Sequence, residues 1–134
     1  MGVPTFATLV NDKVIAPQGD SGQYIVDRHF LQDCMVGLIE KVKVDEDWYL
    51  SAYPDVGKAL ADGVVPDCKT HFVRFGYFEH RMPYRIVVDE PWYLKVYPDI
   101  QRAVDRKGFR SGQDHFDQFG YREGRLPYAN FSLA

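Results

Sequence analysis

The sequence predicts a mainly α-helical protein of two stacked three-helix repeats with a period of 44 residues, preceded by an N-terminal β-hairpin and a cap helix. Three observations support this fold. The first segment (44–84) recurs without a gap as the second segment (88–128), apolar residues within each recur at helical spacing, and prolines and glycines stand where helices begin and end. Because one such unit cannot bury its apolar face alone, the two are expected to share a core.

Length and charge narrow the functional classes. The chain has 134 residues, the size of one domain (1–134), and a net charge of −3 with both signs interspersed, so neither nucleic acid nor an anionic membrane is an expected partner. No stretch approaches the roughly 18 apolar residues of a membrane span, and the first residues lack a signal-peptide pattern. Cytoplasmic localisation is therefore expected, with non-classical export to the surface left open.

Residues 1–20 are expected to form a β-hairpin and a loop. Two short β-type runs, 5–10 and 13–16, flank Asn11-Asp12, a dipeptide that suits a two-residue turn. An isolated hairpin is marginally stable in water, so this one must pack on the rest of the chain or pair with another subunit.

Residues 21–43 are expected to form an amphipathic helix. Apolar residues from Ile25 to Val42 recur at steps of one, three and four. We favour a cap that covers the open end of the repeat stack, and the alternative is a dedicated oligomerisation helix.

Helix-end signals divide each segment into three short helices. In the first segment, Asp45 suits an N-cap, Tyr53 precedes a proline and should end the first helix, and Pro54 opens the second. The third helix carries apolar residues and a histidine at i, i+3, i+4 and i+7, and Gly76 is expected to be its C-terminal cap. The matching residues of the second segment are Asp89, Tyr97, Pro98 and Gly120.

The shared polar residues favour structural roles. His71 and His115 lie on the apolar stripe of the third helix, which favours hydrogen-bonded core histidines over zinc ligands. Helix capping explains the shared acidic residues better than calcium binding does. Arg81 and Arg125 are expected to fasten a shared carboxylate, with Asp55 and Asp99 as the obvious candidates, although ligand contact is the alternative. Two free, mostly buried thiols are expected at Cys34 and Cys68. No metal or cofactor is expected.

The two segments differ most at 57–70 and 101–114. The second version gathers four basic side chains in one short stretch. A solvated helix face is the default interpretation, and the alternative is a patch for an acidic protein surface or an anionic glycan. This basic patch consists of Arg102, Arg106, Lys107 and Arg110.

The shared residues also resemble a known pattern. They are Trp48-Tyr49-Leu50, Tyr53-Pro54-Asp55-Val56, His71-Phe72, Phe75-Gly76, Glu79, Arg81 and Pro83-Tyr84, with their counterparts in the second segment. This set is similar to a bacterial tandem repeat, YL-x2-YPDV…HF-x2-FG-x2-EGR-x-P, of hemolysin-type surface proteins and of glycosyltransferase and polysaccharide-associated proteins. The resemblance implies a bacterial origin and a link to surface carbohydrate, but no activity. His80 stands where that pattern has a glycine.

Two functional hypotheses follow from these observations. No catalytic motif is present, so the protein is not expected to be an enzyme. We favour a non-catalytic protein-interaction or scaffold module that self-associates as a homo-oligomer and is linked to surface polysaccharide. The alternative is a carbohydrate-binding module that stacks sugars on aromatic rings with the help of Arg81 or Arg125. The candidate rings are Trp48, Tyr49, Trp92 and Tyr93.

Overall fold

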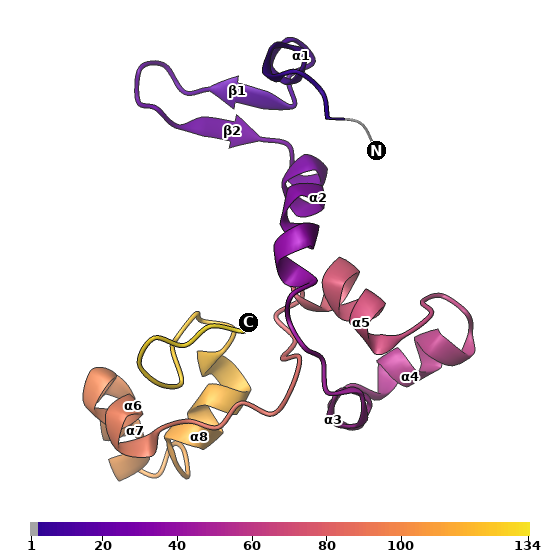
Figure 1. The fold of residues 1–134 in the computed structure, drawn as a ribbon. Helices are drawn as coiled ribbons and strands as arrows, with labels where there is room; N and C mark the ends of the chain where they lie inside the picture. The colour runs from indigo at the N-terminus through magenta and orange to yellow at the C-terminus, as the bar shows by residue number, and fades with distance from the viewer. Residues whose placement is uncertain (1–2) are drawn as a thin grey trace. The chain divides into compact units, whose positions relative to one another are not determined.

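The computed structural model describes residues 3–134 and confirms a mainly α-helical protein with a small antiparallel sheet (Figure 1). Contacts divide the chain into an N-terminal unit that ends at Ile39 and a C-terminal unit, Glu40–Ala134. The single domain that the length suggested stays a prediction. No helix among residues 3–134 is long and apolar enough to cross a membrane.

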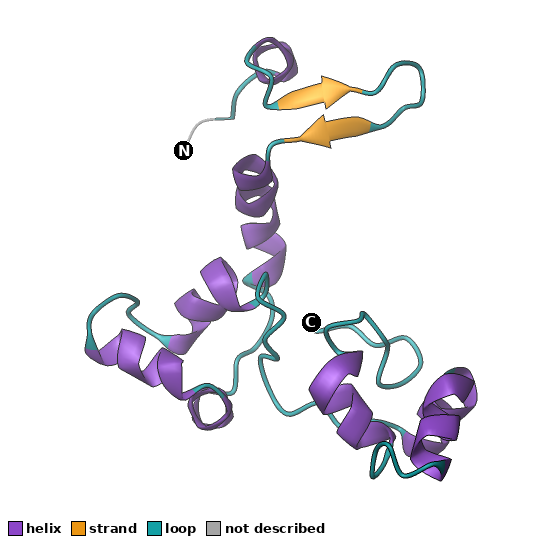
Figure 2. Ribbon diagram, turned by 180° about the vertical axis from the view of Figure 1, so that it is seen from behind, coloured by secondary structure: helices purple, strands orange, loops and turns teal. Residues whose placement is uncertain are grey.

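The N-terminal unit combines two helices with a two-stranded sheet (Figure 2). The predicted strand at 5–10 is wrong, because this stretch is helical. The Thr5 hydroxyl accepts a hydrogen bond from the Thr8 backbone N–H and so caps the helix, which outweighs the weak β preference of the run. The elements of the unit are α1 (Phe6–Asn11), β1 (Ile15–Pro17), β2 (Tyr24–Val26) and α2 (Arg28–Ile39).

The hairpin therefore lies later in the chain than the sequence suggested. β1 and β2 pair antiparallel with Ile15 opposite Val26, and the turn between them contains Gly19 and Gly22, whose φ angles are 53° and 75°. Asn11-Asp12 instead ends α1, and the Asp12 N–H donates to the Thr8 carbonyl.

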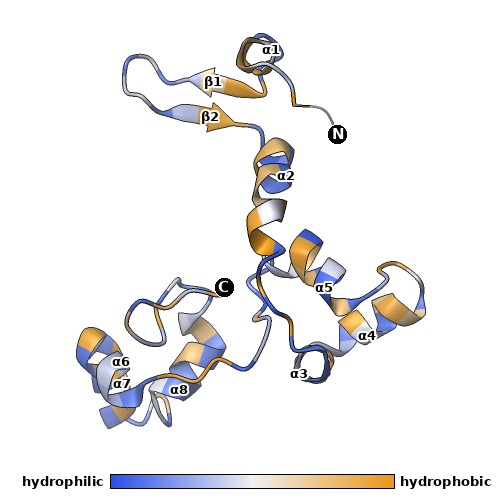
Figure 3. Cartoon of the chain, viewed as in Figure 1, coloured by the Kyte–Doolittle hydropathy of each residue, from blue (hydrophilic) through white to orange (hydrophobic). Residues whose placement is uncertain are grey.

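The predicted helix at 21–43 is shorter than expected. α2 begins only after β2, and the Asp27 carboxylate accepts a hydrogen bond from the Phe30 N–H at 3.0 Å. Hydrophobic residues lie on the strands and along α2 (Figure 3), yet Ile39 is the only buried residue of this helix. Leu31 and Leu38 are 48% and 64% exposed. The apolar stripe of α2 is thus largely uncovered, and its role as a cap stays a prediction.

The C-terminal unit contains both segments, and its helix starts agree with the sequence analysis. Asp45 Oδ1 accepts a hydrogen bond from Trp48 N at 3.1 Å, and Asp89 Oδ1 accepts one from Trp92 N at 3.2 Å. The first segment contains α3 (Glu46–Ala52), α4 (Pro54–Ala61), α5 (Cys68–His71) and the π-helical turn η1 (Phe72–Gly76). The second contains α6 (Glu90–Val96), α7 (Pro98–Asp105), α8 (Gly112–His115) and the π-helical turn η2 (Phe116–Gly120).

The predicted glycine caps are wrong. Gly76 is the last residue of η1 and lacks the positive φ of a left-handed cap, and Gly120 occupies the same place in η2. The Tyr77 N–H donates to the Phe72 carbonyl at 2.9 Å. The left-handed conformation occurs instead at His80 and Gly124, with φ angles of 61° and 77°. His80 therefore adopts the backbone conformation of a glycine at the position where the bacterial pattern has one.

Glycine is required at Gly76 and Gly120 because there is no space for a side chain. A Cβ at Gly76 would collide with the Tyr49 phenol oxygen, and one at Gly120 would collide with that of Tyr93. The helix start and the π-helical turn of each segment therefore pack against each other without intervening atoms.

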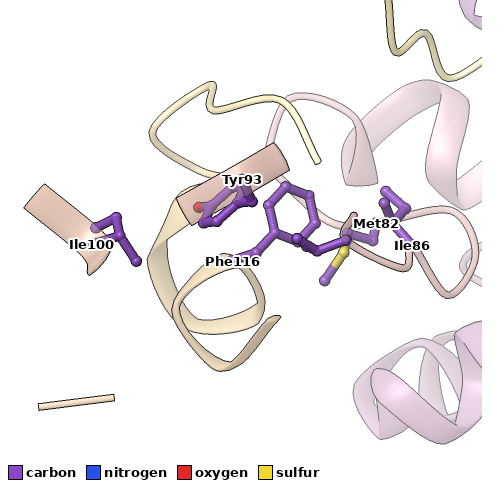
Figure 4. Packing of buried hydrophobic residues seen from close by; sticks show 6 residues of the cluster. Met82, Ile86, Tyr93, Ile100 and Phe116 are labelled. Carbon is purple, nitrogen blue, oxygen red and sulfur yellow. The ribbon is translucent and has the colours of Figure 1, made fainter. Parts of the chain in front are cut away.

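The junction of the two segments, residues 82–88, forms part of the core. Met82, Ile86 and Val88 are buried together with Tyr93 and Phe116 of the second segment (Figure 4). Trp48 and Tyr84 of the first segment pack against the same cluster. Residues 82–88 thus join the two segments through shared apolar contacts.

We predict that Gly76→Ala destabilises the C-terminal unit by about 1–3 kcal/mol, because the added methyl overpacks the contact with Tyr49. Urea unfolding followed by tryptophan fluorescence measures this change. Gly57→Ala is the matched control: its nearest neighbour is the Leu50 side chain at 3.8 Å, so alanine should be neutral or stabilising there. Equal effects of the two changes would contradict the close-contact explanation.

Candidate functional site

Each segment contains a buried tyrosine–histidine pair. The Tyr49 Oη lies 2.9 Å from His71 Nδ1, and the Tyr93 Oη lies 2.8 Å from His115 Nδ1. The tyrosines are fully buried, and the two histidines are 8% and 3% exposed. The prediction of hydrogen-bonded core histidines is therefore confirmed.

Burial controls the protonation of these pairs. It lowers the pKa of both imidazoles below their usual value and raises the pKa of both phenols. The positive charge of Arg81 also lowers the pKa of His71. At His115 the carboxylate of Glu123, 3.8 Å from Nε2, raises the pKa and so opposes the effect of burial. A neutral imidazole that accepts a hydrogen bond from the phenol O–H at Nδ1 satisfies both groups without placing a charge in the core.

A bidentate arginine clamp closes each segment, as the sequence predicted. The Arg81 guanidinium donates to both Asp55 oxygens at 2.9 and 2.7 Å, and Arg125 donates to those of Asp99 at 3.0 and 2.8 Å. These bonds lower the pKa of both aspartates. Because each guanidinium is engaged in this way and each carboxylate partner is largely exposed, we assign the clamps a modest structural role.

The clamps are joined to a second tyrosine in each segment. The Arg81 guanidinium carbon lies 5.0 Å from the centre of the Tyr53 ring, and the Tyr53 Oη accepts a hydrogen bond from the Met82 N–H at 2.8 Å. Arg125 and Tyr97 repeat the stacking at 4.9 Å. The contacts shared by the two segments thus fix the loop after each π-helical turn.

Of the four aromatic rings that were predicted to stack on sugars, two are buried and two are partly exposed. Tyr49 and Tyr93 are buried and cannot meet a ligand, so this part of the prediction is wrong. Trp48 and Trp92 are half-buried, and each packs edge-on against a tyrosine. Each tyrosine follows a tryptophan directly, and neighbouring residues of a helix point in different directions, so the tyrosine is buried while the tryptophan is partly exposed.

The basic patch is exposed at the end of α7 and in the loop that follows. Within residues 3–134 none of its four side chains forms an ion pair. The Arg110 backbone N–H, however, is bonded to Asp114 Oδ2 at 3.0 Å. The patch is compatible with a solvated helix face, and an acidic partner for it stays a prediction. Its members Arg102, Arg106, Lys107 and Arg110 are all exposed.

The remaining candidate ligands for metals do not converge. In the part of the chain that the structure describes, no group of three or more histidine, cysteine, aspartate or glutamate side chains is arranged to hold a metal ion. Both cysteines are free; Cys68 is buried as expected, whereas Cys34 is exposed.

Sequence reasoning missed two features. The Glu90 carboxylate accepts hydrogen bonds from the N–H groups of Gly112 and Gln113 at 2.9 and 3.0 Å and so caps α8 from another helix. A polar pocket of about 490 Å³ also lies between the two segments, lined in part by Tyr53, His80 and Tyr121. No short motif signals either feature, because both depend on contacts between residues more than 20 positions apart.

Comparisons of the chain with protein-family models, with curated proteins and with solved structures gave no match.

We predict that stability falls as the pH is lowered from about 7.5 to 5. The unfolded chain takes up protons at His71 and His115 near pH 6.5, whereas the folded chain takes them up only at lower pH, so the unfolded state binds more protons in this range. Asp55 and Asp99 have lowered pKa values and therefore titrate below this window.

Urea unfolding at several pH values measures this dependence. The double variant His71→Gln/His115→Gln keeps an acceptor for each phenol and should show a weaker dependence on pH. His80→Gln changes an exposed histidine and should leave the dependence intact. The explanation fails if the double variant and the parent protein respond to pH alike.

Proposed function

We propose that the protein is a non-catalytic interaction module that associates with a second copy of itself through its N-terminal unit. We further propose that the two segments are tandem copies of one three-helix unit and form a scaffold linked to surface polysaccharide. The burial of both shared histidines supports the non-catalytic role, since neither can reach a substrate. The matching tyrosine–histidine bonds and arginine clamps support the tandem arrangement.

The observation that carries self-association is the outer edge of β2, with which no other strand pairs within residues 3–134. Hydrogen bonds from Gln18 N to Gln23 O and from Asp27 N to Val14 O flank the paired strands. Because hydrogen-bonded pairs alternate along an antiparallel ladder, the backbone groups of Tyr24 and Val26 must point away from β1. An edge of this kind can pair with another strand.

The outer edge of β1 is less suited to pairing with a strand of a second copy. Pro17 has no N–H to donate, and α1 packs beside this strand. The pairing we propose is therefore β2 with the β2 of the second copy, antiparallel about a two-fold axis. Tyr24 of one copy then exchanges backbone hydrogen bonds with Val26 of the other, which produces a four-stranded sheet.

The small buried core of the N-terminal unit also favours association with a second copy. Chains below about 40 residues usually need disulfides, metals or oligomerisation to fold stably, and Ile15 and Ile39 are the only buried hydrophobic residues among positions 3–39. Several large apolar side chains are exposed instead, and a second copy would cover them. They include Phe6, Tyr24, Ile25, Leu31 and Leu38.

We predict that Val26→Pro converts a dimer into a monomer, because proline removes the outward N–H without breaking a hydrogen bond inside the hairpin. Light scattering after size-exclusion chromatography at about 50 µM protein measures the mass. Val26→Ala is the matched control: it keeps the N–H and should remain dimeric. A monomeric parent protein, or a dimeric Val26→Pro variant, would refute the proposal.

A further inference from the structure

We propose that the pocket between the two segments binds an acidic saccharide, with its carboxylate on Arg122 and its ring against Tyr53 and Tyr121. This inference is independent of self-association. The pocket has a volume of about 490 Å³, within the roughly 300–1,000 Å³ of small-molecule sites. It also differs from the sugar site suggested by the sequence, which relied on the rings of Trp48, Tyr49, Trp92 and Tyr93.

The two tyrosines are held in place by one peptide group. The Tyr53 Oη accepts a hydrogen bond from the Met82 N–H at 2.8 Å, and the Tyr121 Oη donates to the Arg81 carbonyl at 3.3 Å. One ring comes from each segment, and both line the pocket. Because the walls are fixed before a ligand arrives, little ordering accompanies binding.

The charges of the lining identify the anionic group of the ligand. Arg81 is engaged by Asp55 and Glu79, and Asp117 is engaged by Arg85 at 3.0 Å. Arg122 is exposed in the pocket wall and forms no ion pair within residues 3–134. A guanidinium with free donors binds a planar carboxylate through paired hydrogen bonds.

The remaining polar groups suit hydroxyls. The Glu79 and Asp117 carboxylates are acceptors, and the His80 imidazole and the Gln118 carbonyl add further partners along the same wall. The Gln118 amide nitrogen is already bonded to Asp114 at 2.8 Å, which leaves its oxygen as an acceptor. Acceptors for hydroxyls, an aromatic wall and one unpaired cation together match a uronic acid better than a neutral sugar or a simple anion.

Titration of the full chain with D-glucuronic acid, followed by backbone amide shifts in NMR spectra, tests this site. We expect saturable shifts at Gln118, Arg122 and neighbouring residues, with a Kd on the order of 1 mM, as a ligand of this size allows. D-Glucose and acetate should each bind at least about tenfold more weakly, which corresponds to the loss of one good interaction.

Arg122→Gln should weaken glucuronic acid binding about tenfold, and since this side chain is exposed the variant should fold normally. Arg102→Gln, in the basic patch, is the matched control and should bind as the parent does. The Val26→Pro variant should also keep binding, which separates this site from self-association.

Several results would overturn the assignment. They are the absence of saturable shifts, equal binding of glucose, equal binding of acetate, or a loss caused by Arg102→Gln and not by Arg122→Gln. Equal binding of acetate would reduce the pocket to a simple anion site.

Discussion

The buried hydrogen bond between a tyrosine and a histidine is the constraint on which the rest of the C-terminal unit depends. Tyr49 comes from the first helix of its segment and His71 from the third, so this bond fixes how the two helices pack. The phenol oxygen also occupies the space that a side chain at position 76 would need. The close approach of the tyrosine to the π-helical turn therefore goes together with a neutral imidazole and a glycine at the end of that turn. The same three features recur around Tyr93.

The arginine clamps act at the surface and contribute differently. Each joins an aspartate at the start of one helix to the loop after the π-helical turn, and the side chains of Arg81 and Arg125 are only 21% and 23% exposed. Their partners Asp55 and Asp99 are 62% and 50% exposed, so solvent screens both pairs and the gain in stability is modest. Their larger effect is to position the loops: the clamp at Arg81 holds one wall of the polar pocket.

The features that were predictable from sequence are those set by local rules. Asp45 and Pro54 mark helix starts through backbone hydrogen bonding alone, and two in-register segments made the clamp partners recognisable. Local rules failed at Thr5, where a capped helix replaced the expected strand, and at Gly76, where a close contact with Tyr49 and not a left-handed backbone requires glycine. The polar pocket could not be predicted, because its residues come from loops whose approach depends on the packing of the whole unit.

These contacts explain the shared residues by structure, and the binding that we propose lies elsewhere, at the edge of β2 and in the pocket between the segments. The structural role of the shared residues rests on neutral histidines that accept hydrogen bonds from the phenols. Long-range ¹⁵N–¹H NMR spectra of the histidine rings at pH 7 test it directly. For His71 and His115 we expect a neutral ring protonated at Nε2, with an unprotonated Nδ1 that accepts the hydrogen bond. A charged imidazolium, or the tautomer protonated at Nδ1, would contradict the account.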